Sequence, residues 1–490
     1  MAYVDLEIPP GVFANGTARQ ARGRWRLSNL VRWPNGPDLQ PVGGWRPRSE
    51  QTVAGAARAI LTWRDNANQR WIGIGTHTGL YVMTPSGAVH DITPVGFTAG
   101  QEDAFTGGGY GEGVYGAGAY GTRRPDSATI TPASVWTLDT WGQYLVACSE
   151  QDGRLYLWTL DTAQKAQPIA GAPEGCNGLV VTAENFILGL RDRNVAWCDQ
   201  ADEAVWTPDP TNQAGDLDLQ TPGTLMCGRR VRGATLVFSD VDVWQAQYLG
   251  GVAVYGFQRV GADCGLIAKG AAVSLDTRAV WMGKGAFFVF NGGAVDDLPC
   301  EVADHVFGDL NEQQASKVSA WHNTEHGEIW WHYPSANSAE NDRYVAWSYR
   351  TDKWAVGELA RTCGAPAGVF QRPILIDAAG VAWEHETDWN WGGAIPYARS
   401  APVELAPGDR VVKVSGFVGD EKSLGESAVR FFVRAFPNLP ESEHGPYPVS
   451  GAPVDVRFTA RQVETQVEFA ASADSRVGVL RLDLKPGGRR

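Results

Sequence analysis

Short apolar tracts of one design recur along the middle of the chain. Each combines aliphatic and aromatic residues, and polar turn residues separate one tract from the next. The clearest copies are residues 154–158, 194–197 and 344–347, and looser copies are residues 79–83, 242–244, 286–290 and 380–383. Most copies lie roughly 36 to 57 residues apart, the range in which propeller blades repeat. The pattern predicts a β-propeller.

Sets of predicted strands surround these tracts between residues 57 and 383. Short strands with polar turns between them have the rhythm of a β-meander. The sets occupy residues 57–94, 134–169, 179–206, 225–255, 271–298, 318–354 and 367–383. Seven sets are visible, but insertions blur their limits, so six and seven blades both fit the pattern. The best helical stretch, residues 310–317, is short, and the expected fold class is therefore all-β.

The two ends of the chain have other patterns. The first 50 residues hold Pro9-Pro10 and Asn15-Gly16, which mark turns, and little core of their own. Beyond Pro402, four tracts alternate apolar and polar positions cleanly, so that each buries one face of a sheet. We expect an N-terminal extended arm over residues 1–50, a propeller over 51–404, and a C-terminal β-sandwich-like platform domain over 405–490.

An insertion rich in glycine and tyrosine, residues 107–121, follows the first strand set. Tyr110, Tyr115 and Tyr120 recur within it every five residues. Glycine loses the most conformational entropy on folding, so the segment is not expected to order by itself. Two interpretations stay open. It is either a flexible insertion or an adhesive loop that orders against a neighbouring subunit, with the tyrosines as rigid contact area.

Composition and charge narrow the classes of function. The 490 residues carry 55 acidic and 42 basic side chains, a net charge of −13. Such a surface disfavours tight nucleic-acid binding but permits a channel in which DNA slides without sticking. The first residues do not predict a secretory signal, and no window is apolar enough for a membrane span. The seven scattered cysteines are expected to be reduced core residues, with no metal or cofactor site.

Candidate catalytic motifs all have simpler interpretations. The segment from His322 to His326 has the HxxEH spacing of zinc peptidases, but that spacing needs a helix, and this segment reads as a hairpin turn. Asp296-Asp297 and the trio Glu384, Glu386 and Asp388 are interpreted as solvated acidic turns. Trp389 and Trp391 fit packing better than sugar stacking. We therefore expect no catalytic residues and no enzyme.

The N-terminal arm resembles a known family. Residues 9–12, 15–17, 23–25, 29–33 and 41–45 are similar in kind and order to the opening of tail nozzle proteins, also called packaged-DNA stabilisation proteins, of short-tailed bacteriophages. The insertion at 107–121 and the C-terminal tail at 482–490 are similar to that family too. The resemblance touches both ends of the chain and one loop.

The resemblance implies a structural virion protein of the tail, assembled in the host cytoplasm. A hexameric nozzle would extend the DNA channel below the head-to-tail adaptor, help to retain packaged DNA and conduct double-stranded DNA during ejection. Tail fibres or spikes would attach to it. It implies subunit or adaptor contacts at Trp25, Arg32, Trp33, Trp45, Tyr110, Tyr115, Tyr120, Arg489 and Arg490. The alternative is a propeller that binds or cleaves carbohydrate, which would need a central pocket with convergent polar groups.

Overall fold

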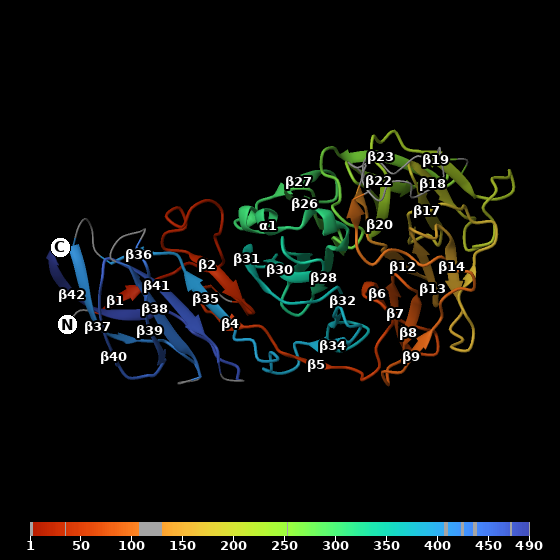
Figure 1. Cartoon of the computed structure of the whole chain (residues 1–490). Coiled ribbons are helices and arrows are strands. Elements are labelled where there is room, and N and C mark those ends of the chain that lie inside the picture. Colours follow the sequence, from red (N-terminus) through yellow and green to blue (C-terminus); the bar gives the residue numbers. More distant parts are fainter. Residues whose placement is uncertain are drawn as a thin grey trace, which may run out of the picture.

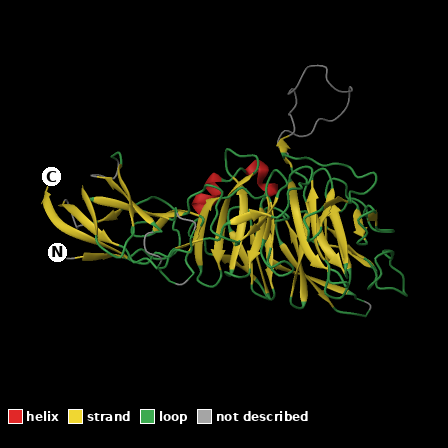
Figure 2. Cartoon of the chain, turned by 90° about the horizontal axis from the view of Figure 1, so that it is seen from below, coloured by secondary structure: helices red, strands yellow, loops and turns green. Residues whose placement is uncertain are grey.

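The chain forms two bodies side by side, a ring of sheets and a smaller platform that holds both described ends of the chain (Figure 1). The computed structural model describes residues 3–34, 36–106, 130–251, 253–405, 410–422, 426–434, 439–470 and 473–489. Helix within these ranges is confined to α1 (Ala303–Asp309) and the 3-10 helix η1 (Glu312–Lys317). Figure 2 shows both short helices on one side of the ring, among strands. The predicted all-β class is confirmed.

Seven four-stranded antiparallel sheets build the ring. The first holds β6 (Ala57–Arg64), β7 (Arg70–Thr76), β8 (Leu80–Met83) and β9 (Val89–Asp91). The second holds β12 (Trp136–Trp141), β13 (Tyr144–Ser149), β14 (Leu155–Trp158) and β15 (Gln167–Pro168). The third holds β16 (Gly178–Val181), β17 (Ile187–Arg191), β18 (Asn194–Trp197) and β19 (Gly215–Asp218). The fourth holds β20 (Leu225–Val231), β21 (Ala234–Ser239), β22 (Val243–Tyr248) and β23 (Tyr255–Gly261).

The remaining three sheets complete the circle. The fifth holds β24 (Ala272–Leu275), β25 (Arg278–Met282), β26 (Phe287–Phe290) and β27 (Val295–Leu298). The sixth holds β28 (Ser319–Asn323), β29 (Glu328–Pro334), β30 (Asn341–Ser348) and β31 (Lys353–Glu358). The seventh holds β32 (Cys363–Ala365), β33 (Ile374–Ile376) and β34 (Ala382–His385), and its fourth strand is β5 (Trp45–Pro47) from the arm.

The first strands of the seven sheets contact one another in a closed cycle. β6 contacts β12, and the contacts continue through β16, β20, β24, β28 and β32 back to β6. Two-residue turns join strands in the second to fifth sheets, where Gly142, Asp192, Gly233 and Asp276 adopt the positive φ angles that such turns require. This closed circle of four-stranded meanders is a β-propeller.

Large aromatic side chains fill the spaces inside and between these sheets. Trp158, Trp281, Trp331 and Trp354 are fully buried. The seven cysteines are free; six are buried, which confirms the prediction of core residues for those six, and Cys300 is half-buried. The segment from His322 to His326 leaves β28 and enters a turn at Gly327 before β29, so the predicted hairpin is confirmed.

Two sheets build the platform. Sheet A has the order β1 (Tyr3–Leu6), β42 (Leu480–Arg489), β37 (Arg410–Val418) and β40 (Val454–Ala460). Sheet B has the order β2 (Trp25–Asn29), β35 (Tyr397–Ser400), β41 (Gln462–Glu468), β38 (Ala428–Arg434) and β39 (Ser442–Pro448), and β36 (Val403–Glu404) also pairs with β41. Residues from both sheets, among them Phe417, Phe431 and Phe458, share one apolar cluster.

The arm crosses from one body to the other. It supplies β1 to sheet A, β2 to sheet B and β5 to the seventh propeller sheet, with the small pair β3 (Val31–Arg32) and β4 (Gln40–Pro41) between them. β35 and β36, which the sequence boundary at 404 groups with the propeller, belong to sheet B. No described helix is long and apolar enough to cross a membrane.

Candidate functional site

A cavity of about 350 Å³ lies at the centre of the propeller. Residues of all seven first strands line it, which makes it the central channel. Each of these strands is the edge of its own sheet, so its outer backbone groups need partners other than a neighbouring strand. The channel is therefore the place where polar side chains are required whether or not a ligand binds.

Side chains of the channel supply those partners. Thr137 and Asp139 on β12 accept hydrogen bonds from the backbone N–H groups of Leu179 and Val181 on β16, at 3.0 and 2.9 Å. Arg229 on β20 donates to the carbonyl oxygens of Lys269 and Ala272 next to it, at 2.9 and 3.0 Å. These bonds tie one sheet to the next.

Asp139 forms an ion pair with Arg230 in the channel. Burial raises the pKa of its carboxyl, although the nearby Arg230 guanidinium and the N–H groups of Val181 and Thr140 act in the opposite direction. Arg230 lies 2.8 Å from the carboxylate. Trp136 and Trp321, which also line the cavity, are 2% and 3% exposed, so neither offers an open ring face for stacking a sugar.

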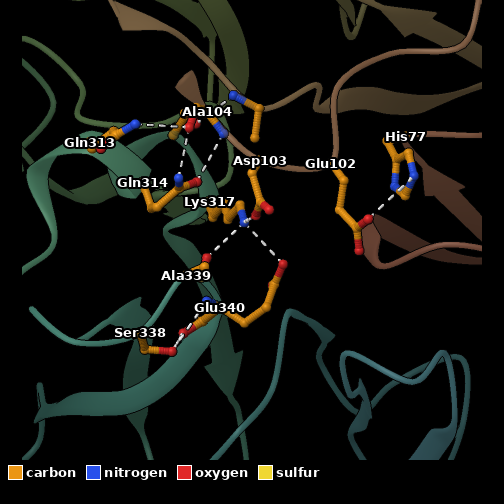
Figure 3. Close-up of polar contacts among 12 residues, drawn as sticks. His77, Glu102, Asp103, Ala104, Gln313, Gln314, Lys317, Ser338, Ala339 and Glu340 are labelled. Atoms are coloured by element: carbon orange, nitrogen blue, oxygen red, sulfur yellow. Dashed lines mark hydrogen bonds and ion pairs between the residues drawn. The ribbon is translucent and has the colours of Figure 1, made fainter. Parts of the chain in front are cut away.

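A cluster of ions lies beside the channel, next to the segment that leads into the insertion (Figure 3). Arg58, which lines the channel, donates to Glu340 at 2.5 and 2.8 Å. Lys317, at the end of η1, contacts Glu340 at 3.0 Å and Asp103 at 2.5 Å. The side chains of Arg58 and Lys317 are 1% and 0% exposed. Burial would raise the pKa of the Glu340 carboxyl, but Arg58 and Lys317 outweigh burial and lower it.

The segment next to Asp103 is fixed by η1 as well. Gln313 and Gln314 donate to the carbonyl oxygen of Ala104 at 3.1 and 2.8 Å, and Gln314 accepts from the N–H of Ala104 at 2.9 Å (Figure 3). The short pair β10 (Phe105–Thr106) and β11 (Ile130–Thr131) follows immediately. We call residues 102–106 the strap. The strap, which is the last described segment before the insertion, is held against the propeller.

Tyr110, Tyr115 and Tyr120 of the insertion lie outside the described residues. Arg490 lies outside them too, and Arg489 ends β42. Trp25 and Trp33 are buried, at 5% and 4% exposed, and their rings lie 6.4 Å apart. Trp45 is half-buried and stacks on His385 of the seventh propeller sheet. In the single chain these arm residues therefore contact its own domains.

Arg32 joins the arm to two propeller sheets. Its guanidinium, 5% exposed, contacts Glu328 on β29 at 3.0 and 3.1 Å and Glu386 beyond β34 at 2.5 and 3.1 Å. Glu386 also accepts from the N–H of Gly43 at 2.8 Å and from Asn323 at 2.9 Å. Burial would raise the pKa of Glu386, but the charge and hydrogen bonds of Arg32 outweigh it and lower that pKa to about 2.

The interpretation of Glu386 as part of a solvated turn is wrong. Its side chain is 8% exposed because the arm covers it. Glu384 is likewise engaged, with Arg46 at 3.0 Å and with Arg48. Asp296 and Asp297 are exposed, as expected, but they lie on strand β27 and not in a turn. Trp391 is buried and donates to the carbonyl oxygen of Val42, so the packing interpretation is confirmed for it.

The sequence alone did not indicate Arg58, Lys317 or Glu340. They are far apart in the chain, and each stands in a stretch without a motif. Lys317 follows a polar tract that predicts a short helix, which is a weak signal for a buried cation. Only the approach of β6, η1 and the turn before β30 places their charges together.

Comparisons with known proteins identify no family for the chain. No protein-family model and no curated protein matches the chain. Streptogramin B lyase is similar over 70% of this chain and 98% of its own, with 7% identity and a TM-score of 0.42. Virginiamycin B lyase from Staphylococcus aureus covers 70% of this chain and 97% of its own at 6% identity, with a TM-score of 0.41. A chain of the mitotic checkpoint complex covers 70% and 96% at 11% identity, with a TM-score of 0.42.

These neighbours are β-propeller proteins, and at such low scores they carry no argument about chemistry. The sheets and their cyclic contacts define the class of protein: an all-β chain with a β-propeller joined to a two-sheet platform.

Proposed function

We propose that the chain is a structural virion protein, the tail nozzle of a short-tailed bacteriophage. Six copies would form a ring below the head-to-tail adaptor, extend the DNA channel, help to retain the packaged genome and conduct DNA during ejection. Tail fibres or spikes would attach to the ring. The resemblance of the arm, the insertion and the C-terminal tail to nozzle proteins supplies the family, and the architecture supports a mechanical role.

The observation that carries the proposal is the path of the arm. One segment, from Tyr3 to Pro47, contributes strands to both platform sheets and to the propeller. A load applied to one body is therefore transmitted to the other through paired strands and not through a single linker. This coupling suits a protein that must hold its shape against pressurised DNA.

The platform supplies the surfaces that a ring needs. β1, at the edge of sheet A, exposes Tyr3 at 41% and Val4 at 49%. An edge strand with apolar side chains in water is a common site of subunit contact. Head-to-tail contacts of this kind close into a ring when the rotation between subunits fits. We place the platform at the ring contact and the propeller outside it.

We further infer that the seven sheets are seven blades and that the propeller is a rigid spacer. Its channel polar groups hold neighbouring sheets together, and the cluster at Arg58, Lys317 and Glu340 fixes the strap. In this proposal the ion clusters are structural elements, and the insertion rooted at the strap contacts a neighbouring subunit or narrows the exit.

Native mass, measured over a series of protein concentrations, tests the proposal. A hexamer has a mass near six times 52.9 kDa. A species of that mass that persists on dilution supports the nozzle. A mass of one chain at every concentration, with purified adaptor also present, refutes it.

A further inference from the structure

Four basic side chains gather at one end of sheet A. Lys413 on β37 lies in register with Lys485 on β42 and with Thr459 on β40. Register partners in an antiparallel sheet share a face, and side chains two residues apart along a strand share it as well. Arg457, two residues before Thr459, therefore shares the face of Lys413. Arg410 begins β37 beside them, in register with Arg489.

We call Arg410, Lys413, Arg457 and Lys485 the basic row. All four are exposed, whereas Val414, Val456 and Phe458 between them are buried on the opposite face. Lys413, Arg457 and Lys485 therefore belong to the outer face of sheet A, whereas Arg410 lies two residues before the buried Val412 and is exposed at the beginning of β37. Figure 1 places sheet A at the end of the molecule farthest from the propeller.

The described residues give the basic row no ion-pair partner. Within the described residues, no carboxylate lies within 4 Å of any of its four members. Asp455 and Asp483 lie further along the same strands, and Asp483 is occupied by a hydrogen bond from Ser415 at 2.7 Å. Like charges directly opposite each other weaken a sheet, so Lys413 and Lys485 are unfavourable neighbours unless an anion bridges them.

Three arginines of sheet B, in contrast, form ion pairs with carboxylates. Arg399 lies 2.6 Å from Glu441 and from Glu464. Arg434 lies 3.2 Å from Glu464 and also contacts Glu441. Arg430 on the same strand is paired in the same way with Glu443 and Glu468. The net charge of the chain is −13, so carboxylates are in excess. Cations of sheet A that pair with no described carboxylate therefore need an explanation.

Protection against aggregation does not explain these cations. Lysine on an edge strand prevents edge-to-edge pairing, but β37 and β42 are the two central strands of sheet A. A lipid surface is also a poor fit, because membrane-binding surfaces set basic residues beside a broad apolar face. This face carries Lys413, Thr459 and Lys485 in one row, with Tyr3 beside Asp483 as an aromatic neighbour.

We propose that the basic row contacts the phosphate backbone of double-stranded DNA. This inference rests on the proposed nozzle function and identifies the surface of the nozzle that contacts the DNA. A lysine or arginine at a phosphate displaces condensed counterions and binds without sequence preference. Four cations on an otherwise acidic protein give a weak contact, which steadies a duplex without arresting its passage.

Salt-dependent binding of a short duplex of random sequence to the full chain tests this proposal. The key variant is Lys413→Gln with Lys485→Gln. The matched control is Lys165→Gln with Lys284→Gln, which removes two exposed cations from the propeller, at 40% and 65% exposure. Fluorescence anisotropy at several salt concentrations gives the slope of log affinity against log salt, and electron microscopy of the same samples reports the rings.

The key variant should lower the steepness of that slope by about 1.8, which is about 0.9 per lost phosphate contact, and lower affinity on the order of 100-fold at 50 mM salt. The control variant should keep the wild-type slope. Wild-type protein that does not bind the duplex, or a key variant with the wild-type slope, overturns the proposal. If rings form but the key variant keeps the wild-type slope, the proposed nozzle is supported and the DNA-contact surface is refuted. If the slope changes but no rings form, the DNA-contact surface is supported and the proposed nozzle is refuted.

Discussion

Replacing Arg32 by leucine should release the arm from the propeller. The substitution removes the one guanidinium that contacts both Glu328 and Glu386, and leaves two carboxylates that the arm still covers. Arg32 and its hydrogen bonds hold the pKa of Glu386 at about 2, against 4.5 for a free glutamate. That difference corresponds to about 3 kcal/mol at neutral pH. Removing one partner of a buried ion pair costs about 3 to 5 kcal/mol, so we expect a loss in that range.

The pH dependence identifies the cause. A carboxyl whose pKa is lowered on folding stabilises the protein fully above its unfolded value, here 4.5, and the contribution disappears as the pH falls toward 2. In Arg32→Leu the buried carboxylate of Glu386 loses its cation, and it takes up a proton on mild acidification because burial raises its pKa. The difference in stability between wild type and variant should therefore be largest near neutral pH and shrink as the pH falls toward 4.

Urea unfolding followed by tryptophan fluorescence at several pH values measures this difference. Midpoints are compared for each transition, because a chain of this size with two bodies need not unfold in one step. Arg46→Leu is the matched control. Arg46 also lies on the arm and pairs with Glu384 at 3.0 Å, but its side chain is 64% exposed, so its loss should cost at most about 1 kcal/mol. Equal losses in the two variants, or a loss in Arg32→Leu that does not change with pH, would refute the reasoning.

Three further perturbations test other parts of the molecule. Lys317→Met leaves Asp103 without its cation and should speed proteolysis and hydrogen exchange of the strap, whereas Lys284→Met, at an exposed lysine, should leave both rates unchanged. Burial lowers the pKa of His332 to about 3, so the unfolded chain binds a proton there below pH 6.5 and the folded chain does not. His332→Gln should remove about 2 kcal/mol of the stability lost between pH 7 and pH 5, and urea midpoints at the two pH values check it. Deleting residues 107–121 should impair assembly or DNA retention and keep the propeller folded by circular dichroism; unchanged particle stability would remove the insertion from the account.

The propeller could be predicted because its information is local and repeated. Alternating tracts such as those at 154–158 and 344–347 are strands in the structure, and turn residues separate them. The closure of the ring could not be read in this way. The three residues of β5 carry no strong pattern, and their pairing with β34 joins positions more than 300 residues apart.

The buried ion pairs could not be predicted from sequence for the same reason, because their members lie far apart in the chain. Glu386 stands in an acidic tract that is typical of a solvated turn, and only coverage by Arg32 and Gly43 of the arm changes its environment. Lys317 and Arg58 carry no motif, and their partner Glu340 precedes β30 in another part of the chain. The α1 helix was also missed, because seven residues are too few for a periodic signal.

Single-particle electron microscopy of the purified chain tests the central claim most directly. The account predicts six-fold rings with an axial hole, in which the platforms surround the hole and the propellers lie at the periphery. Rings with the propellers around the axis, or only isolated two-body particles when adaptor is also present, would contradict it.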